Sequence, residues 1–308
     1  MTTAFLTHPD ALNHVNPDGH AECVARLEAI YRATDDLDLL RIEAPLADNA
    51  AVLRAHPQRY IDRLEAAQPE AGTVALDPDT HLSAGSLQAA RRAAGAAVKA
   101  VDIVLDGEAG NAFVAMRPPG HHAEPEKPMG FCLFGNIAIA ALHALEARGL
   151  SRVAIVDFDV HHGNGTQAIL RDEPRIRFFS SHGMPLYPGT GEASERGAHG
   201  QIVNIPLPPH STGALYREKL ESVILPTLED FKPELLLLSA GFDAHTGDPL
   251  ADLDWQDDDF IYATARLCDA AEKHCGGRLV SLLEGGYNLS TLGGLVRAHI
   301  GVLQEHSA

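Results

Sequence analysis

Short apolar runs alternate with amphipathic or Ala-rich stretches along most of the chain. Uninterrupted apolar strands interleaved with helices are typical of a parallel sheet that is covered on both faces. The runs that predict strands are residues 112–116, 152–158, 176–181, 234–241 and 278–285. The stretches that predict helices are residues 86–105, 136–148, 212–230 and 257–273. The pattern therefore predicts an α/β fold built on a parallel sheet.

A polar cluster follows each of the five predicted strands. In chain order the clusters read RPPGHH, DFDVHHGNG, SSHG, GFDAHTGDP and EGGYN. Because the carboxyl ends of parallel strands meet at one edge of the sheet, and ligands gather at that edge, we expect these side chains to surround one site.

Length and charge narrow the classes of protein that this site can belong to. The 308 residues contain no internal repeat and no long linker, so we expect a single domain over 1–308. Acidic residues outnumber basic ones by 42 to 24, for a net charge of −18, which disfavours binding to nucleic acid or to anionic membranes. The chain has no apolar run of about 18 residues and no signal peptide, and its four cysteines lack paired metal spacing. We therefore expect a cytoplasmic protein that binds neither nucleic acid nor a membrane.

Three side chains at two strand ends could hold a metal ion. Asp159 and His161 point to one side of their strand if its geometry continues, and Asp248 in HTGDP closes the set from a second strand. Two carboxylates and one imidazole leave an open coordination position, as a catalytic zinc ion requires. An isolated Asp-x-His pair is more often a solvated strand end, but the third carboxylate and the other clusters favour a metal site.

The tandem histidines His121 and His122 follow two prolines and a glycine, which fix a rigid loop. Asp157, one step deeper in its strand than Asp159, and Asn164 are suitable hydrogen-bond acceptors for the two imidazoles. A charged acceptor raises the pKa of an imidazole more than a neutral one does. The two histidines could therefore divide the duties of general base and general acid.

Three aromatic residues lie in glycine-rich loops near the same edge. Tyr287 in EGGYN is placed to donate a hydrogen bond to an oxyanion, unless it merely packs on the surface. Phe131 in EKPMGFC and Tyr187 in PLYPGTG could form the walls of a narrow tunnel, although aromatic residues in loops are more often part of the core.

Several long motifs together resemble the zinc-dependent histone deacetylase family, close to its class II and bacterial amidohydrolase branch, which includes acetylpolyamine amidohydrolases. They are RPPGHHAEPEKPMGFCLFGNIAIAA, VDFDVHHGNGTQ, LYPGTGE, LSAGFDAHTGDPL and LLEGGYNL, with HPDALNHVNPDGHAECVARL near the N-terminus. The resemblance runs from about residue 8 to 295. It implies an arginase/deacetylase-like α/β fold with a central, parallel, eight-stranded sheet flanked by helices.

The resemblance also implies roles for individual residues. The metal ligands fall on Asp159, His161 and Asp248, the tandem histidines on His121 and His122, and the transition-state tyrosine on Tyr287. A second set of roles concerns the substrate and a structural potassium ion. Substrate contacts fall on Phe131, Tyr187 and the carbonyl of Gly130, and the potassium contacts fall on the side chains of Asp157 and Ser180 and the carbonyls of Asp157, Asp159, His161 and Ser181. Asn164 matches class II, because class I members have Asp there.

Some positions bear on the substrate. GHAE stands where the family usually has GHPE, and His81 replaces a common Tyr. In polyamine-specific relatives an acidic gatekeeper can stand seven residues after the last Asp ligand. That position is Trp255 here, which we therefore expect to contact the substrate, with Asp252 and Asp254 close by in sequence.

The predicted reaction is zinc-dependent removal of acetyl or other acyl groups from primary amines, with acetyl-lysine favoured over acetylated polyamines as substrate. A ureohydrolase with two manganese ions would need a second full set of metal carboxylates, and the motifs supply one set. A non-catalytic acyl-lysine binder would lack Tyr287 or the tandem histidines, and all three are present. The oligomeric state stays open, and a homo-oligomer is one outcome that the sequence allows.

Overall fold

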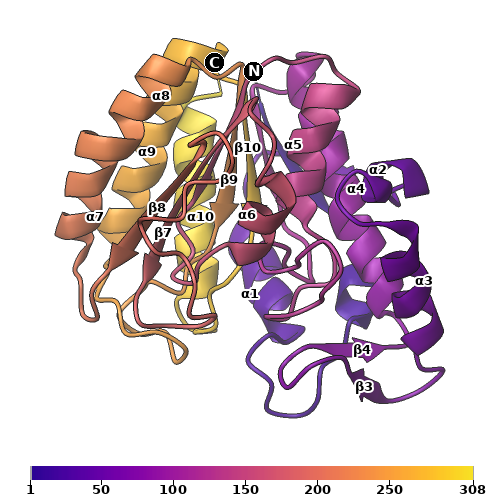
Figure 1. The fold of residues 1–308 in the computed structure, drawn as a ribbon. Coiled ribbons are helices and arrows are strands. Elements are labelled where there is room, and N and C mark those ends of the chain that lie inside the picture. Colours follow the sequence, from indigo (N-terminus) through magenta and orange to yellow (C-terminus); the bar gives the residue numbers. More distant parts are fainter. Residues whose placement is uncertain (1, 308) are drawn as a thin grey trace.

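The computed structural model describes residues 2–307, in which eight strands form one parallel sheet (Figure 1). The strand order is β2-β1-β5-β10-β9-β6-β7-β8, and every pairing between neighbours is parallel. The strands are β1 (Thr3–Thr7), β2 (Leu40–Glu43), β5 (Asn111–Val114), β6 (Val153–Asp157), β7 (Ile176–Gly183), β8 (Ile202–Leu207), β9 (Leu235–Ala240) and β10 (Leu279–Leu283). The expected eight-stranded parallel sheet is confirmed. A separate antiparallel hairpin pairs β3 (Thr73–Ala75) with β4 (His81–Ser83).

Helices cover both faces of this sheet. On one face, α4 packs against β1, β5 and β10, while α5 packs against β6 and β9; on the other, α9 and α10 pack against central strands, and α1 packs on α10. The long helices are α1 (Ala25–Thr34), α3 (Gln58–Ala67), α4 (Ser86–Leu105), α5 (Asn136–Glu146), α9 (Asp257–Cys275) and α10 (Leu292–Glu305). The shorter helical segments are η1 (Pro9–Asn13), α2 (Asn49–Leu53), α6 (Asn164–Leu170), α7 (Gly213–Lys219), η2 (Leu220–Ile224) and α8 (Leu225–Phe231).

The apolar pattern located the inner strands well and the outer ones poorly. All five predicted strands are present as β5, β6, β7, β9 and β10. The pattern missed β2, whose residues are mostly exposed at the sheet edge, and it missed β1 and β8 as well. The single helix predicted over 212–230 is α7 and α8 joined by the π-helical turn η2. Pro226 lacks the N–H that a regular α-helix would need there, which accounts for the irregular turn.

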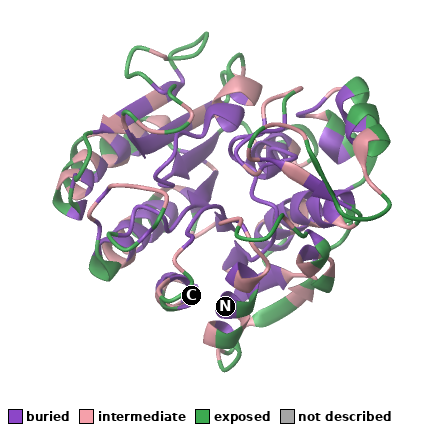
Figure 2. Cartoon of the chain, turned by 90° about the horizontal axis from the view of Figure 1, so that it is seen from below, coloured by how far each residue is buried: buried purple, intermediate pink, exposed green. Residues whose placement is uncertain are grey.

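The strand order brings all five polar clusters together. β5, β10, β9, β6 and β7 are consecutive neighbours in the sheet, so the loops at their carboxyl ends share one edge. This edge faces downward in Figure 1, whereas both termini lie at the top. Seen from below, the central strands are largely buried and much of the exposed chain lies toward the periphery (Figure 2). In residues 2–307 no helix is both long enough and apolar enough to span a bilayer.

A close approach in this fold yields a test of stability. Gly95 lies inside α4, and a Cβ atom there would stand 2.1 Å from the Pro45 carbonyl oxygen and 2.6 Å from the Ala47 nitrogen. Alanine is intrinsically better than glycine in a helix by about 1 kcal/mol. Because backbone atoms are the obstacle, we expect overpacking to outweigh that gain, and Gly95→Ala to lower the free energy of unfolding by about 1–3 kcal/mol.

Urea unfolding followed by circular dichroism measures this change. Gly301→Ala is the matched control, because Gly301 lies in α10 and a Cβ there meets no atom within 4 Å. The control should be neutral or stabilising. Equal stability of the two variants would contradict the packing described for α4.

Candidate active site

Three buried side chains converge where β6 and β9 end. Asp159 and His161 follow β6, Asp243 follows β9, and their ligand atoms all lie within 4.8 Å of one another. His161 Nδ1 is 3.1 Å from Asp159 Oδ1 and 3.2 Å from Asp243 Oδ2. This metal group, as we call it, is the only cluster of that kind in residues 2–307 whose members are all buried.

The chemistry of the metal group fits a divalent cation. Asp243 Oδ2 is buried and has no hydrogen-bond partner within the described chain, although His161 lies beside it. Burial, together with the neighbouring Asp159 carboxylate, raises the pKa of Asp243. A cation would relieve this crowding of negative charge, and two carboxylates with one imidazole are a donor set that zinc accepts.

The structure corrects the predicted third ligand. Asp248 does not belong to the metal group, which contains Asp243 instead. The Asp248 carboxylate accepts hydrogen bonds from backbone N–H groups, those of Tyr287 at 2.7 Å, Asn288 at 3.2 Å and Leu250 at 3.0 Å. Both aspartates occur in GFDAHTGDP, and the loop after β9 places Asp243, not Asp248, beside Asp159 and His161.

The tandem histidines have the two acceptors that the sequence suggested. His121 Nδ1 lies 3.0 Å from Asp157 Oδ2, and His122 Nδ1 lies 2.7 Å from Asn164 Oδ1. The two rings are 4.0 Å apart, and both are buried. Glu284 fixes their loop, because its Oε2 accepts the N–H groups of Gly120 at 2.7 Å and His121 at 3.1 Å.

The surroundings of the two imidazoles push their pKa values apart. Burial opposes protonation of His121, but the carboxylates of Asp159 and Asp157 outweigh it and hold the pKa of His121 well above its usual range. Burial, aided by the positive charges on His121 and His161, holds the pKa of His122 well below its usual range. The neutral imidazole is therefore His122 and the charged one His121.

Glu124 determines which way the Asn164 amide points. Asn164 Nδ2 donates to Glu124 Oε1 at 2.9 Å, so the amide oxygen is the atom that faces His122. That oxygen only accepts, which places the proton of His122 on Nδ1 and leaves a lone pair on Nε2. Both Glu124 and Asn164 line a cavity of about 530 Å³, and no residue of the metal group lines it.

Tyr287 lies in the loop that follows β10. Its side chain is 9% exposed, and burial raises the pKa of its phenol well above the usual value, so the phenol keeps its proton. The guanidinium of Arg26 stacks 4.7 Å from the centre of the Tyr287 ring. Arg26 also donates to the carbonyl oxygens of Glu284 and Gly286, at 2.5 Å and 2.7 Å.

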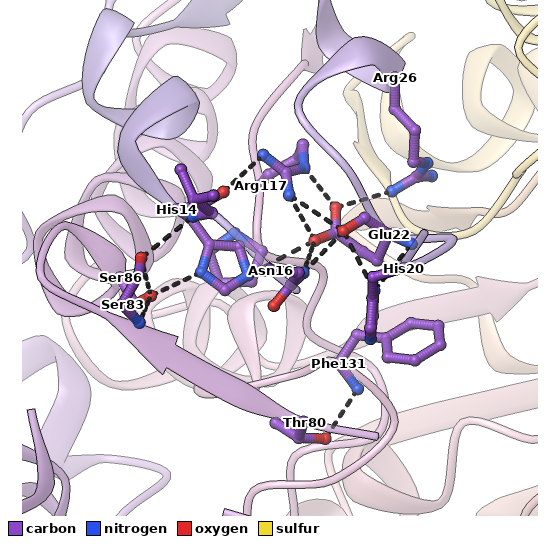
Figure 3. Close-up of polar contacts among 12 residues, drawn as sticks. His14, Asn16, His20, Glu22, Arg26, Thr80, Ser83, Ser86, Arg117 and Phe131 are labelled. Carbon is purple, nitrogen blue, oxygen red and sulfur yellow. Dashed lines mark hydrogen bonds and ion pairs between the residues drawn. The ribbon is translucent and has the colours of Figure 1, made fainter. Parts of the chain in front are cut away.

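Phe131 and Tyr187, the two aromatic residues predicted to contact the substrate, lie beside Tyr287 and His122, and their contact with a substrate stays a prediction. The Phe131 ring lies 5.7 Å from the Tyr287 ring, and the Tyr187 ring lies 5.2 Å from the His122 ring, centre to centre. Gly130 packs so closely on His122 that a Cβ atom would stand 2.3 Å from its Cδ2. Phe131 N–H donates to Thr80 Oγ1 at 3.0 Å (Figure 3).

Trp255 is buried in the core, which contradicts its prediction as a substrate contact. Its side chain is 1% exposed and packs on the rings of Tyr216 at 4.3 Å and Phe260 at 5.3 Å. Its backbone N–H donates to Ala244 O at 3.1 Å, and its carbonyl accepts Thr246 N–H at 2.9 Å. Trp255 therefore braces the loop that follows β9.

The residues predicted for a potassium ion are adjacent and buried. Asp157 in β6 pairs with Ser180 in β7, and Ser181 Oγ donates to the Asp157 carbonyl at 3.3 Å. Asp159 and His161 continue from β6 into the metal group, so the two predicted cation sites share residues. The potassium ion itself stays a prediction.

A buried ion network that the sequence motifs did not suggest joins the N-terminal segment to the loops after β5 and β10. Glu22 lies between Arg117 and Arg26, and all three side chains are 0% exposed (Figure 3). Arg117 also donates to the carbonyls of Ala11 and His14, each at 3.1 Å. Glu22 and Arg26 both lie in HAECVARL. Their spacing of one helical turn is the feature of the sequence that could have predicted this ion pair.

Comparisons with known proteins agree with this geometry. The family model for the histone deacetylase domain matches residues 20–303. A histone deacetylase-like amidohydrolase from Pseudomonas aeruginosa is 41% identical over 278 residues, which cover 88% of this chain and 73% of that protein. A probable deacetylase from Archaeoglobus fulgidus is 38% identical over 315 residues, with coverage of 98% and 86%.

A solved structure, the crystal structure of the HDA15 HD domain, matches with a TM-score of 0.93 and 34% sequence identity. The match covers 99% of this chain and 88% of the HDA15 chain. Fold, site and sequence agree, and the chain belongs to the histone deacetylase family of amide-bond hydrolases.

Proposed function

We propose that this protein is a zinc-dependent deacetylase that removes acetyl groups from acylated primary amines, with acetyl-lysine as its main substrate. One observation carries the proposal. A buried imidazole with a neutral acceptor and a buried imidazole with a charged acceptor stand beside a three-donor metal group. An amide hydrolase needs these parts: a base, an acid, and a site for an electrophilic metal.

The metal group suits the electrophilic role. A zinc ion held by Asp159, His161 and Asp243 would polarise the acyl carbonyl and lower the pKa of a water molecule to about 7. The remaining steps belong to side chains of this chain. His122 Nε2, whose lone pair is left free by the Nδ1–H bond to Asn164, accepts a proton from the attacking water. A proton then passes from one of the two imidazolium groups to the departing amine.

Tyr287 supplies the second contact to the developing oxyanion. A phenol that keeps its proton can donate a hydrogen bond to the carbonyl oxygen as negative charge grows there. Phe131 and Tyr187 border the entrance, so a slim alkyl stem suits the passage better than a bulky ring.

One feature favours acetyl-lysine over acetylated polyamines. With Asp243 as the last ligand, the gatekeeper position seven residues later is Leu250, which has no charge to pair with a polyamine ammonium group. The net charge of −18 favours cationic substrates of either kind. Acetylpolyamine hydrolysis therefore remains the alternative within the same reaction.

The other candidate functions have less support. A two-manganese ureohydrolase needs a second buried group of ligands, whereas the other candidate cluster in residues 2–307 is the largely exposed Asp269, Glu272 and His306. A non-catalytic binder has no use for the paired imidazoles. The potassium ion, the cytoplasmic location and the absence of nucleic-acid or membrane partners belong to the proposal as well.

The substrate proposal is tested with acetyl-lysine peptides, acetylated polyamines and longer acyl-lysines, assayed on the zinc-loaded protein at low and high salt. We expect acetate release from acetyl-lysine peptides, with kcat/KM that falls as salt screens the acidic surface. A preference for polyamines by orders of magnitude would contradict the assignment of substrate. No turnover of any acylated amine would contradict the proposed function.

Asp243→Ala tests the metal group. Loss of one of three protein ligands should remove most of the zinc that the wild type retains after dialysis, about one ion per chain, as measured by atomic emission. Asp258→Ala, in the exposed first turn of α9, is the control carboxylate and should keep its metal. Full zinc occupancy in Asp243→Ala would rule out Asp243 as a ligand.

Tyr287→Phe tests the oxyanion contact. The variant should fold and retain zinc, yet lose on the order of 10²–10³ in kcat, because one donor to the oxyanion is gone. Steady-state kinetics, with zinc content and circular dichroism as controls, give the answer. A kcat near that of the wild type would contradict the proposed hydrogen bond from Tyr287 to the oxyanion.

A further inference from the structure

One short loop after β9 connects the metal group to Tyr287. The loop begins with Asp243, which belongs to the metal group, and ends with Asp248, which binds the segment that carries Tyr287. Asp248 is 7% exposed, so its carboxylate is largely removed from water and needs partners inside the protein.

Asp248 finds those partners in the backbone next to the phenol. Its Oδ2 accepts the N–H of Tyr287 at 2.7 Å and that of Asn288 at 3.2 Å, while its Oδ1 accepts the N–H of Leu250 at 3.0 Å. Asn288 returns a contact, because its Nδ2 donates to the Gly247 carbonyl at 2.8 Å. Hydrogen bonds donated in both directions therefore join the loop after β9 to the loop after β10.

The Tyr287 segment needs such a restraint. β10 ends at Leu283, and the chain then passes through Gly285 and Gly286, the latter with φ of +113°. Glycines allow many backbone conformations, so they do not by themselves fix where the next side chain points. Arg26 holds the carbonyls that precede the tyrosine, at Glu284 and Gly286, but the N–H of Tyr287 itself is held by Asp248.

We propose that Asp248 is a positioning residue for Tyr287. Asp248 acts by binding the backbone of Tyr287. Because Asp243 and Asp248 belong to the same loop, this bond fixes the phenol relative to the metal group. The loop is stiffened by its own contacts, since Asp248 N–H donates to His245 O at 2.8 Å and Gly247 N–H donates to His245 Nδ1 at 3.1 Å. This inference rests on the proposed function, in which Tyr287 contacts the developing oxyanion.

The proposal predicts a particular pattern of kinetics. Asp248→Ala should lower kcat by about 10-fold to 100-fold with a smaller change in KM, because a displaced catalytic group costs rate more than binding. In the Tyr287→Phe background the same change should cost little, about twofold or less, since the group that Asp248 positions is already absent. Zinc content should match the wild type, in contrast to Asp243→Ala.

A second readout does not depend on activity. Hydrogen exchange, followed by mass spectrometry on peptides that cover 284–290, should be faster in Asp248→Ala than in the wild type. Asp248→Asn preserves one acceptor oxygen, so its exchange and its kcat should fall between those two proteins; it also replaces Asp248→Ala if the alanine variant does not fold. Asp258→Ala serves as the control and should match the wild type.

Three results would overturn the proposal. They are an equal loss of rate from Asp248→Ala with and without the Tyr287 hydroxyl, a loss of zinc as large as that in Asp243→Ala, or unchanged exchange over 284–290. If the wild type fails to hydrolyse any acylated amine, the proposed function fails instead. The exchange measurement then still decides whether Asp248 holds the Tyr287 segment.

Discussion

The burial of several charged side chains at one sheet edge is the constraint on which the rest of the site depends. Buried carboxylates are costly unless they are paired or hydrogen-bonded. Here they join the loops of three strands. Asp159 Oδ2 accepts Gly285 N–H at 2.8 Å, Asp243 Oδ1 accepts Val160 N–H at 3.0 Å, and Asp157 Oδ1 accepts Asp159 N–H at 3.1 Å.

Glycines make this packing of carboxylates possible. A Cβ atom at Gly241 would stand 2.1 Å from Asp159 Oδ2, and one at Gly285 would stand 1.9 Å from Asp243 Oδ2. The strand ends after β9 and β10 therefore require residues without side chains so that the carboxylates after β6 and β9 can fit. The glycines in SAGFD and EGGYN are explained by this close approach as much as by turn geometry.

The sequence predicted what depends on strand order and local motifs. Buried strands and helices follow from the apolar pattern, and the meeting of His121 with Asp157 and of His122 with Asn164 follows from clusters at parallel strand ends. The sequence did not reveal how the loop after β9 turns. That turn decides that Asp243 enters the metal group and that Asp248 faces Tyr287 instead.

Other features depend on contacts between distant segments, which spacing alone does not reveal. Trp255 appeared to be an entrance residue when it was counted from Asp248, but its backbone pairs with the loop after β9 and its ring packs in the core. The network of Glu22, Arg26 and Arg117 joins the N-terminal segment to the loops after β5 and β10. Such a network could be seen only once the sheet order was known.

The central claim is that one metal site, formed by Asp159, His161 and Asp243, organises the chemistry at this edge. A crystal structure of the zinc-loaded protein, with anomalous diffraction recorded at the zinc absorption edge, tests it most directly. We expect one strong peak per chain at this edge, about 2.0–2.2 Å from a carboxylate oxygen of each aspartate and from a ring nitrogen of His161. A zinc ion bonded to Asp248, or a peak away from these three side chains, would contradict the account.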